Sequence, residues 1–204
     1  MPSTLAPNPP ALILASTSPY RRALLQRLRL PFDCIAPQVD ETPRPGELAG
    51  ALAQRLALEK AHAVAAQHPS AVVIGADQVA ELDGVAIGKP GNHANAVAQL
   101  QAMRGRSVLF HTAVAVVQQH TGFAQSALAV VQVQFRPLDD AQIERYLRAE
   151  TPYDCAGSAK CEGLGISLLT AIHSDDPTAL IGLPLIHTCT LLGLAGIHVL
   201  GQAA

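Results

Sequence analysis

Short apolar runs alternate with segments of helical periodicity along the first half of the chain. Apolar runs at 11–15 and 32–36 predict two short strands, and Pro19, a residue favoured at the first helical position, opens a predicted helix that extends through residue 28. After a loop rich in proline and glycine at 42–46, apolar residues at helical spacing predict a second helix from about residue 48 to 67. This alternation is typical of α/β proteins.

The remainder of the chain predicts further strands and three more helices. Residues 71–76 predict a buried strand that ends at Asp77, and the Asp-Gly pair at 83–84 is typical of a hairpin turn. Asn92 can cap a helix that runs to Met103. The other predicted elements are an antiparallel pair of strands at 108–117 and 127–135, a helix from 139 to about 149, a strand at 166–172, and a buried loop, helix and strand within 178–204.

The chain length of 204 residues fits one domain, with a core large enough to need no metal or disulfide for stability. We expect residues 1–10, which carry prolines but no signal-peptide pattern, to be a disordered leader, and residues 11–204 to form the domain. Four cysteines have neither disulfide nor metal-ligand spacing, and we expect them to be reduced thiols of a cytoplasmic protein: Cys34, Cys155, Cys161 and Cys189. Frequent glycine, proline and histidine residues argue against a membrane span near the C-terminus.

The charges are nearly balanced, with 14 basic and 16 acidic residues, so no overall field attracts a nucleic-acid polymer. A phosphate-bearing partner must therefore be small and held locally. The chain has few lysines, and Lys60, Lys89 and Lys160 each fall beside a group of residues that resembles a site. Each alone could be a surface lysine with a buried stem. Three scattered ammonium groups together suit a triphosphate.

Two further groups have the chemistry of a phosphate and metal site. Residues 16–22, Ser-Thr-Ser-Pro-Tyr-Arg-Arg, join a strand to a helix and offer hydroxyls, free amide groups and arginines to oxyanions. Ordinary capping of the helix by Ser18 is the alternative. Asp77 follows a buried strand, where a carboxylate could hold a divalent cation or deprotonate water, and the acidic pair at 40–41 could share that cation.

Several common catalytic motifs are missing from the sequence. It contains no G-x-S-x-G, P-loop or G-x-G-x-x-G pattern, which removes the main support for a serine hydrolase, a P-loop enzyme or a dinucleotide-binding fold. The eight histidines show no metal-ligand spacing.

Six ordered motifs resemble those of the Maf-like nucleotide pyrophosphatases, and they cover the chain from about residue 11 to 192. They are the segments 15–22, 40–42, 59–61, 75–78, 88–90 and 182–185. The resemblance implies a mixed α/β fold with an elongated sheet, flanking helices and a central cleft. It implies a cytoplasmic enzyme, often a homodimer, that uses a divalent cation such as Mg²⁺ or Mn²⁺ to split a nucleoside triphosphate into the monophosphate and pyrophosphate.

The resemblance also implies roles for individual residues. Asp77 matches the proton acceptor of the family, and it would hold the metal together with Glu41. The residues that match the phosphate environment are Ser16, Arg21, Lys60 and Lys89.

Three positions resemble the branch of the family that is assigned to 7-methylguanosine triphosphate. This chain has Tyr20, Gln78 and Glu162, where the members that act on thymidine and uridine triphosphates have Arg, Thr and Gln. N7-methylation makes guanine cationic, so a carboxylate at 162 suits it in charge and in hydrogen bonding, and an aromatic ring at 20 offers a π face. A purely structural role for Tyr20 in the first helical turn is the alternative.

Two other functions stay open at this point. One is the same reaction on uridine or thymidine triphosphate. The other is a nucleotide-sensing regulator of cell division that binds a triphosphate without hydrolysing it.

Overall fold

The computed structural model describes residues 10–201, so the predicted leader lies outside the described residues apart from Pro10. A mixed seven-stranded sheet with the order β2-β1-β3-β5-β6-β7 forms the centre, and β4 pairs with β3 beside this path. β1 is parallel to both of its neighbours, and the other pairs are antiparallel. The strands are β1 (Leu12–Ala15), β2 (Asp33–Cys34), β3 (Val72–Leu82), β4 (Val85–Ile87), β5 (Ser107–Gln118), β6 (Phe123–Phe135) and β7 (Leu169–His173).

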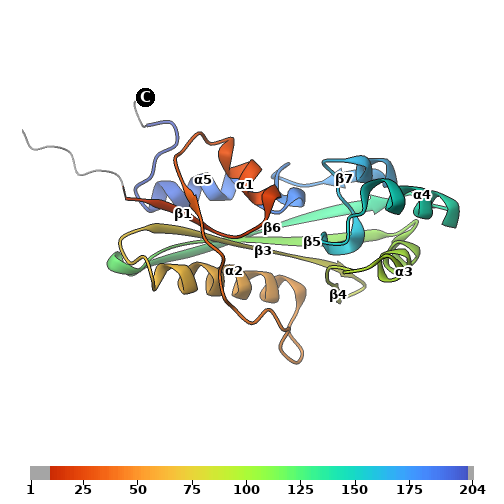
Figure 1. The fold of residues 1–204 in the computed structure, drawn as a ribbon, viewed down its shortest axis with the longest axis horizontal. Coiled ribbons are helices and arrows are strands. Elements are labelled where there is room, and N and C mark those ends of the chain that lie inside the picture. Colours follow the sequence, from red (N-terminus) through yellow and green to blue (C-terminus); the bar gives the residue numbers. More distant parts are fainter. Residues whose placement is uncertain (1–9, 202–204) are drawn as a thin grey trace, which may run out of the picture.

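Five α-helices flank this elongated sheet (Figure 1). α2 lies along one face, α1 and α5 lie on the other face, and α3 and α4 lie at one end (Figure 1). Each group of helices covers its own cluster of buried aliphatic side chains. In the described part of the chain, none of the helices has the length and apolarity needed to cross a bilayer. The helices are α1 (Pro19–Gln26), α2 (Ala49–Ala65), α3 (His93–Met103), α4 (Asp140–Glu150) and α5 (Leu185–Leu194).

Gly75 allows α2 to pack very closely against β3. A Cβ atom at this position would lie 2.2 Å from the carbonyl oxygen of Ala57 and 2.7 Å from the amide nitrogen of Ala61. Only glycine leaves room for two backbones at this separation. The close contact brings the middle of α2, including Lys60, to the part of β3 that follows Gly75.

The edge of β3 is uncovered over a short stretch. β1 pairs with Val72–Gly75 and β4 pairs with Ala80–Leu82, which leaves residues 76–79 without a partner on that side. The prediction that the strand ends at Asp77 is wrong, because β3 extends to Leu82. β3 continues for five residues because its other edge stays paired with β5, where Asp77 lies opposite Ala113. The crevice forms where β1 ends.

Most of the other predicted elements are confirmed. Asp83 and Gly84 both have positive φ angles, 53° and 80°, as a tight hairpin between β3 and β4 requires. Asn92 caps α3 by accepting a hydrogen bond from the amide of Asn95 at 2.9 Å. The two long runs form the antiparallel strands β5 and β6, both longer than predicted.

Three predicted elements differ from the structure. The strand at 32–36 is reduced to the two residues of β2. Residues 166–168 belong to a 3₁₀ turn, so β7 begins only at Leu169. After α5, the residues described up to 201 form turns and no strand, because Gly196 and Gly201 interrupt the apolar segment. All four cysteines are free thiols, as expected.

Candidate active site

A cleft of about 690 Å³ opens beside the uncovered edge of β3. The turn between β1 and α1, the loop that precedes α2, the segment after β4 and the segment 154–162 all contribute to its walls. All nine predicted site residues line it: Ser16, Tyr20, Arg21, Glu41, Lys60, Asp77, Gln78, Lys89 and Glu162. A second hollow, of about 800 Å³, is a shallow depression on the outer face of α2 and contains none of these residues. The cleft is therefore the candidate active site.

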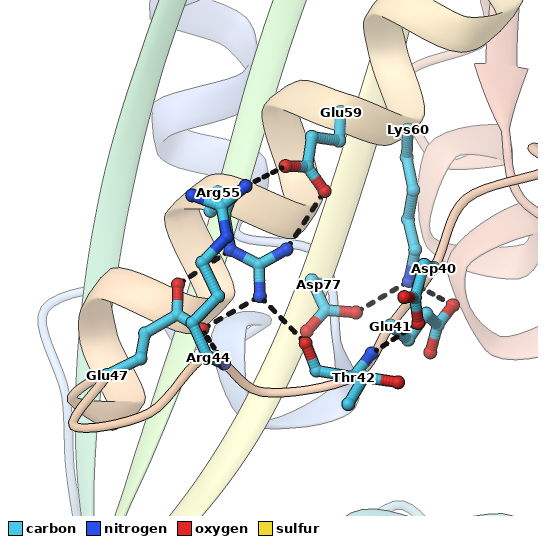
Figure 2. A network of polar contacts seen from close by, with 9 residues as sticks. All are labelled: Asp40, Glu41, Thr42, Arg44, Glu47, Arg55, Glu59, Lys60 and Asp77. Carbon is cyan, nitrogen blue, oxygen red and sulfur yellow. Dashed lines mark hydrogen bonds and ion pairs between the residues drawn. The ribbon is translucent and has the colours of Figure 1, made fainter.

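Lys60 joins the two predicted acidic residues. Its Nζ atom lies 2.7 Å from Oδ1 of Asp77 and 2.7 Å from Oε1 of Glu41 (Figure 2). Lys60 and Asp77 are buried, with 5% and 7% of their surface exposed. Such a pair is tolerated inside a protein because each charge neutralises the other. The second oxygen of Asp77 has no hydrogen-bond partner among residues 10–201.

Glu41 reaches this pair from an exposed loop. Burial alone would raise the pKa of the Glu41 carboxyl, but the hydrogen bond from Lys60 and the nearby positive charges of Lys89 and Arg21 outweigh burial and lower it. Glu41 is therefore ionised at neutral pH, beside the ammonium of Lys60.

Arg21 projects from the first turn of α1. Its Nε atom donates a hydrogen bond to the carbonyl oxygen of Gly182 at 2.9 Å. Burial lowers the pKa of Arg21, whereas the charges of Asp77 and Glu41 oppose that change. The guanidinium still carries its charge, because arginine does not lose its proton in proteins. Its terminal nitrogens have no hydrogen-bond partner in the described part of the chain, so they are free to bind an anion.

The two serines of this turn have different positions. Ser18 caps α1, since its hydroxyl accepts a hydrogen bond from the amide of Arg21 at 3.4 Å. Ser16 is buried on the cleft wall, and its hydroxyl accepts a hydrogen bond from the amide of Ser18 at 3.1 Å. The capping alternative is thus confirmed for Ser18. Arg22 is exposed and does not line the cleft.

Lys89 is exposed at the rim, in the segment that follows β4. No ion pair involves it in the described range of the chain, and its charge helps to lower the pKa of Glu41. Arg21, Lys60 and Lys89 therefore face one cavity from three elements that are far apart in the sequence. An anion with several charged oxygens suits this arrangement.

Acidic residues surround the other part of the cleft, around Tyr20. Burial raises the pKa of Tyr20 to about 12, with further contributions from Cys155 and Asp154. Lys160 has its Nζ atom 5.5 Å from the centroid of the Tyr20 ring. That ammonium is already paired with Glu150, with 2.8 Å between Nζ and Oε1.

The charges of the cleft are thus divided. In one part of the cleft, the cations of Lys60, Arg21 and Lys89 lie near the carboxylates of Asp77 and Glu41. At the Tyr20 end, Asp154 and Glu162 are exposed carboxylates without an ion pair among the described residues. A ligand with an anionic tail and a cationic head matches this division.

Gln78 lies on the opposite face of β3 from Asp77, as the alternation of side chains along a strand requires. Its Nε2 atom donates to Oγ1 of Thr112 at 2.9 Å and to the carbonyl oxygens of Ala179 and Leu180 at 3.0 Å each. These bonds hold the turn at Ala179–Ile181 against the sheet. Gln78 therefore shapes the wall of the cleft.

Asp154 had no signal in the sequence, and the contact made by Gly182, which lies in the motif 182–185, was not predictable. Asp154 stands alone between Tyr153 and Cys155, without a motif, and only the fold brings it to Tyr20. The carbonyl of Gly182 orients Arg21, and a backbone group of this kind cannot be recognised from residue type.

A divalent cation would find a limited set of ligands here. No group of three or more His, Cys, Asp or Glu side chains in the part of the chain that the structure describes could hold a metal ion by itself. Asp77 and Glu41 do approach a common point, because both contact the ammonium of Lys60. Mg²⁺ is often held by one or two carboxylates together with substrate phosphates and water, so these residues fit such an ion when substrate supplies the other ligands.

Comparisons with known proteins agree with one another. The chain is 70% identical over 190 residues to a 7-methyl-GTP pyrophosphatase of Albidiferax ferrireducens, a match that covers 93% of this chain and 96% of that protein. It is 63% identical to a protein of the same name from Polaromonas sp., over 96% of this chain and 89% of that one. A third, from Paraburkholderia xenovorans, is 61% identical over 95% of this chain and 96% of its own length.

Among solved structures, a HAM1 protein from Coxiella burnetii covers 64% of this chain and 75% of its own, with 19% sequence identity and a TM-score of 0.48. The model of the family described as Maf-like protein matches residues 11–195, which include every element from β1 to α5. The predicted mixed α/β fold with flanking helices and a cleft is confirmed, and the chain belongs to the Maf-like protein family.

Proposed function

We propose that this protein hydrolyses 7-methyl-GTP to 7-methyl-GMP and pyrophosphate, and so removes a modified nucleotide from the cellular pool. Relatives that are 61–70% identical over nearly the whole chain carry the name 7-methyl-GTP pyrophosphatase. The divided charge of the cleft supports the same substrate independently. A polyphosphate suits the end with Arg21, Lys60 and Lys89, and a cationic base suits the end with Asp154 and Glu162.

In this proposal the reaction begins with a water molecule beside Asp77. The free carboxylate oxygen of Asp77 takes a proton from the water while the oxygen of that water bonds to the α-phosphorus. The bond from the α-phosphorus to the bridging oxygen breaks, and pyrophosphate leaves with the electron pair of that bond. Lys60, Lys89 and Arg21 stabilise the negative charge that grows on the leaving group.

The proposal includes a divalent cation held by Asp77 and Glu41. When bound, such a cation supplies positive charge to the phosphate oxygens and so makes pyrophosphate a better leaving group. In the absence of the cation, Lys60 contacts both carboxylates and holds them close together. The ammonium therefore preorganises the acidic pair, since two bare carboxylates would repel each other.

Recognition of the base is assigned to Tyr20 and Glu162. The carboxylate of Glu162 can accept hydrogen bonds from N1-H and the exocyclic amine of guanine while matching the positive charge of the methylated ring. The ring of Tyr20 can stack on a cationic base, a contact worth about 0.5–2 kcal/mol. Uridine and thymidine triphosphates have no cationic ring, so they would lack the charge match with Glu162 and the cation–π part of the contact with Tyr20.

The single observation that carries the proposal is the contact of Lys60 with Asp77 and Glu41 inside a cleft that also holds two free cations. The direct test is to incubate the purified protein with a series of divalent cations and with 7-methyl-GTP, GTP, UTP or dTTP, and to measure pyrophosphate. We expect 7-methyl-GTP to react fastest. Faster release from UTP or dTTP would assign the protein to the other branch, and no release from any of them would contradict an enzymatic function.

The sensor alternative predicts a different result for the variant Asp77→Asn. An enzyme should keep nucleotide binding and lose hydrolysis, whereas a sensor should keep its signalling.

We also propose, from the family resemblance, that the protein is a cytoplasmic homodimer. Light scattering of the full chain and cell fractionation test these two points.

A further inference from the structure

Residues 40–46, which carry Glu41, form a loop with no buried side chain. Every residue from Asp40 to Gly46 is exposed, so burial contributes little to holding the loop in place. Within the described residues, three polar contacts join it to α2 (Figure 2). These are Glu41 with Lys60, the Thr42 carbonyl with Arg55, and Arg44 with Glu59.

Arg55 provides the most extensive of these connections. Its Nη2 atom donates to the carbonyl oxygen of Thr42 at 3.2 Å, directly after Glu41 in the chain. The same guanidinium makes a bidentate pair with Glu47, at 2.6 Å and 2.7 Å, and contacts Glu59 at 3.0 Å. Only 13% of its side chain is exposed. Arg55 thus contacts Thr42 in the loop, Glu47 directly after the loop, and Glu59 one helical turn further along α2.

Glu47 reinforces this arrangement from the end of the loop. Its Oε2 atom also accepts a hydrogen bond from the amide of Arg44 at 2.9 Å. The hydrogen bonds from Arg55 and from that amide lower the pKa of Glu47 to about 2. Glu47 therefore stays ionised, and the geometry of the pair is retained, throughout the physiological pH range. A bidentate arginine pair fixes orientation as well as distance.

Arg55 does not line the cleft, so it has no direct contact with a bound nucleotide. Its effect on the site passes through the loop. Without the bond to the Thr42 carbonyl, only two of the three contacts would join this segment to α2: Glu41 with Lys60, and Arg44 with Glu59. The second is an exposed ion pair, and such pairs contribute little.

We propose that Arg55 is a positioning residue that holds Glu41 against Lys60 and Asp77. This inference rests on the proposed function, because it assigns Glu41 a part in that reaction. It also makes a claim about the loop that does not depend on any activity.

The test compares Arg55→Gln and Arg55→Lys with a control, Arg145→Gln. Arg145 is an exposed helical arginine without an ion pair in the described range. Thermal unfolding first establishes that each variant is folded. Hydrogen–deuterium exchange of the peptide over residues 40–46 is then measured in all four proteins. We expect faster exchange in Arg55→Gln and no change in the control. Arg55→Lys should show an intermediate rate, because a lysine ammonium can form a hydrogen bond here but not the bidentate pair with Glu47.

The second measurement is a double-mutant cycle on pyrophosphate release from 7-methyl-GTP. Residues that support a site from outside commonly change activity by 10-fold or more, so Arg55→Gln should lower kcat/KM by about 10-fold. In the Glu41→Gln background, Arg55→Gln should lower kcat/KM by less than about twofold, because the carboxylate that Arg55 positions is already lost.

The outcomes separate the two proposals. Unchanged exchange over 40–46 in Arg55→Gln, or equal losses of activity in both backgrounds, would overturn the positioning role. If the wild-type protein releases no pyrophosphate, the proposed function fails, and the exchange comparison still decides whether Arg55 holds the loop.

Discussion

The ammonium of Lys60 on α2 and the carboxylate of Asp77 on β3 form a buried ion pair, with 2.7 Å between Nζ and Oδ1. The two residues meet because α2 lies directly on β3 at Gly75. The pair lies where β1 has ended and β4 has not begun, so the sheet edge exposes Asp77 to the cleft. A gap in strand pairing thus makes a buried carboxylate accessible to a ligand.

Removal of Lys60 should affect stability as well as activity. Lys60→Met leaves the Asp77 carboxylate buried without a partner, a change that typically costs about 3 kcal/mol of unfolding free energy. In the Asp77→Asn background the same substitution should cost much less, because no buried charge remains. Chemical denaturation of the four proteins of this cycle measures both values. Equal costs in the two backgrounds would show that the pair contributes nothing specific.

Gly75→Ala should separate α2 from β3. The added Cβ would overlap the Ala57 carbonyl, and overpacking of this kind costs about 1–3 kcal/mol. The shift would also move Lys60 away from Asp77, so activity should fall more than stability alone explains.

The matched control for that change is Gly193→Ala in α5. A Cβ atom there would meet only His198, at an ordinary 3.8 Å, and alanine favours a helix. We expect an unchanged or slightly higher melting temperature. If both alanine variants behaved alike, the close packing at Gly75 would have no special importance.

Selectivity for a cationic base should depend on the carboxylates at the Tyr20 end. Asp154→Asn and Glu162→Gln each remove one negative charge near the base. Each should lower kcat/KM for 7-methyl-GTP relative to GTP by about 5- to 10-fold, which corresponds to a loss of roughly 1 kcal/mol of charge attraction. Asp33→Asn, an exposed position outside the cleft, is the control. A ratio that stays constant in both cleft variants would exclude charge matching as the basis of selectivity.

Local signals in the sequence predicted local structure well. Asn92, the Asp-Gly pair at 83–84 and the two long apolar runs each act through neighbouring residues, and the structure has the helix, the hairpin and the strand pair that they predict. The extent of β3 beyond Asp77 could not be predicted in this way. It depends on pairing with β5, which lies far away in the sequence.

The same distinction applies to the site. Motifs identified the residues around the cleft, because the chemistry of phosphate binding limits the residue types that can serve. Their contacts were not predictable. The pair of Lys60 with Asp77 requires the packing at Gly75, the place of Asp154 beside Tyr20 requires the whole fold, and Arg55 acts through a backbone carbonyl.

The central claim is that water attacks the α-phosphorus of a nucleotide bound beside Asp77. The most direct test is to let the protein react with 7-methyl-GTP in ¹⁸O-labelled water and to determine by mass spectrometry which product carries the label. The account predicts ¹⁸O in 7-methyl-GMP, none in pyrophosphate, and loss of the reaction in Asp77→Asn. Label in pyrophosphate, or an unchanged rate in Asp77→Asn, would contradict it.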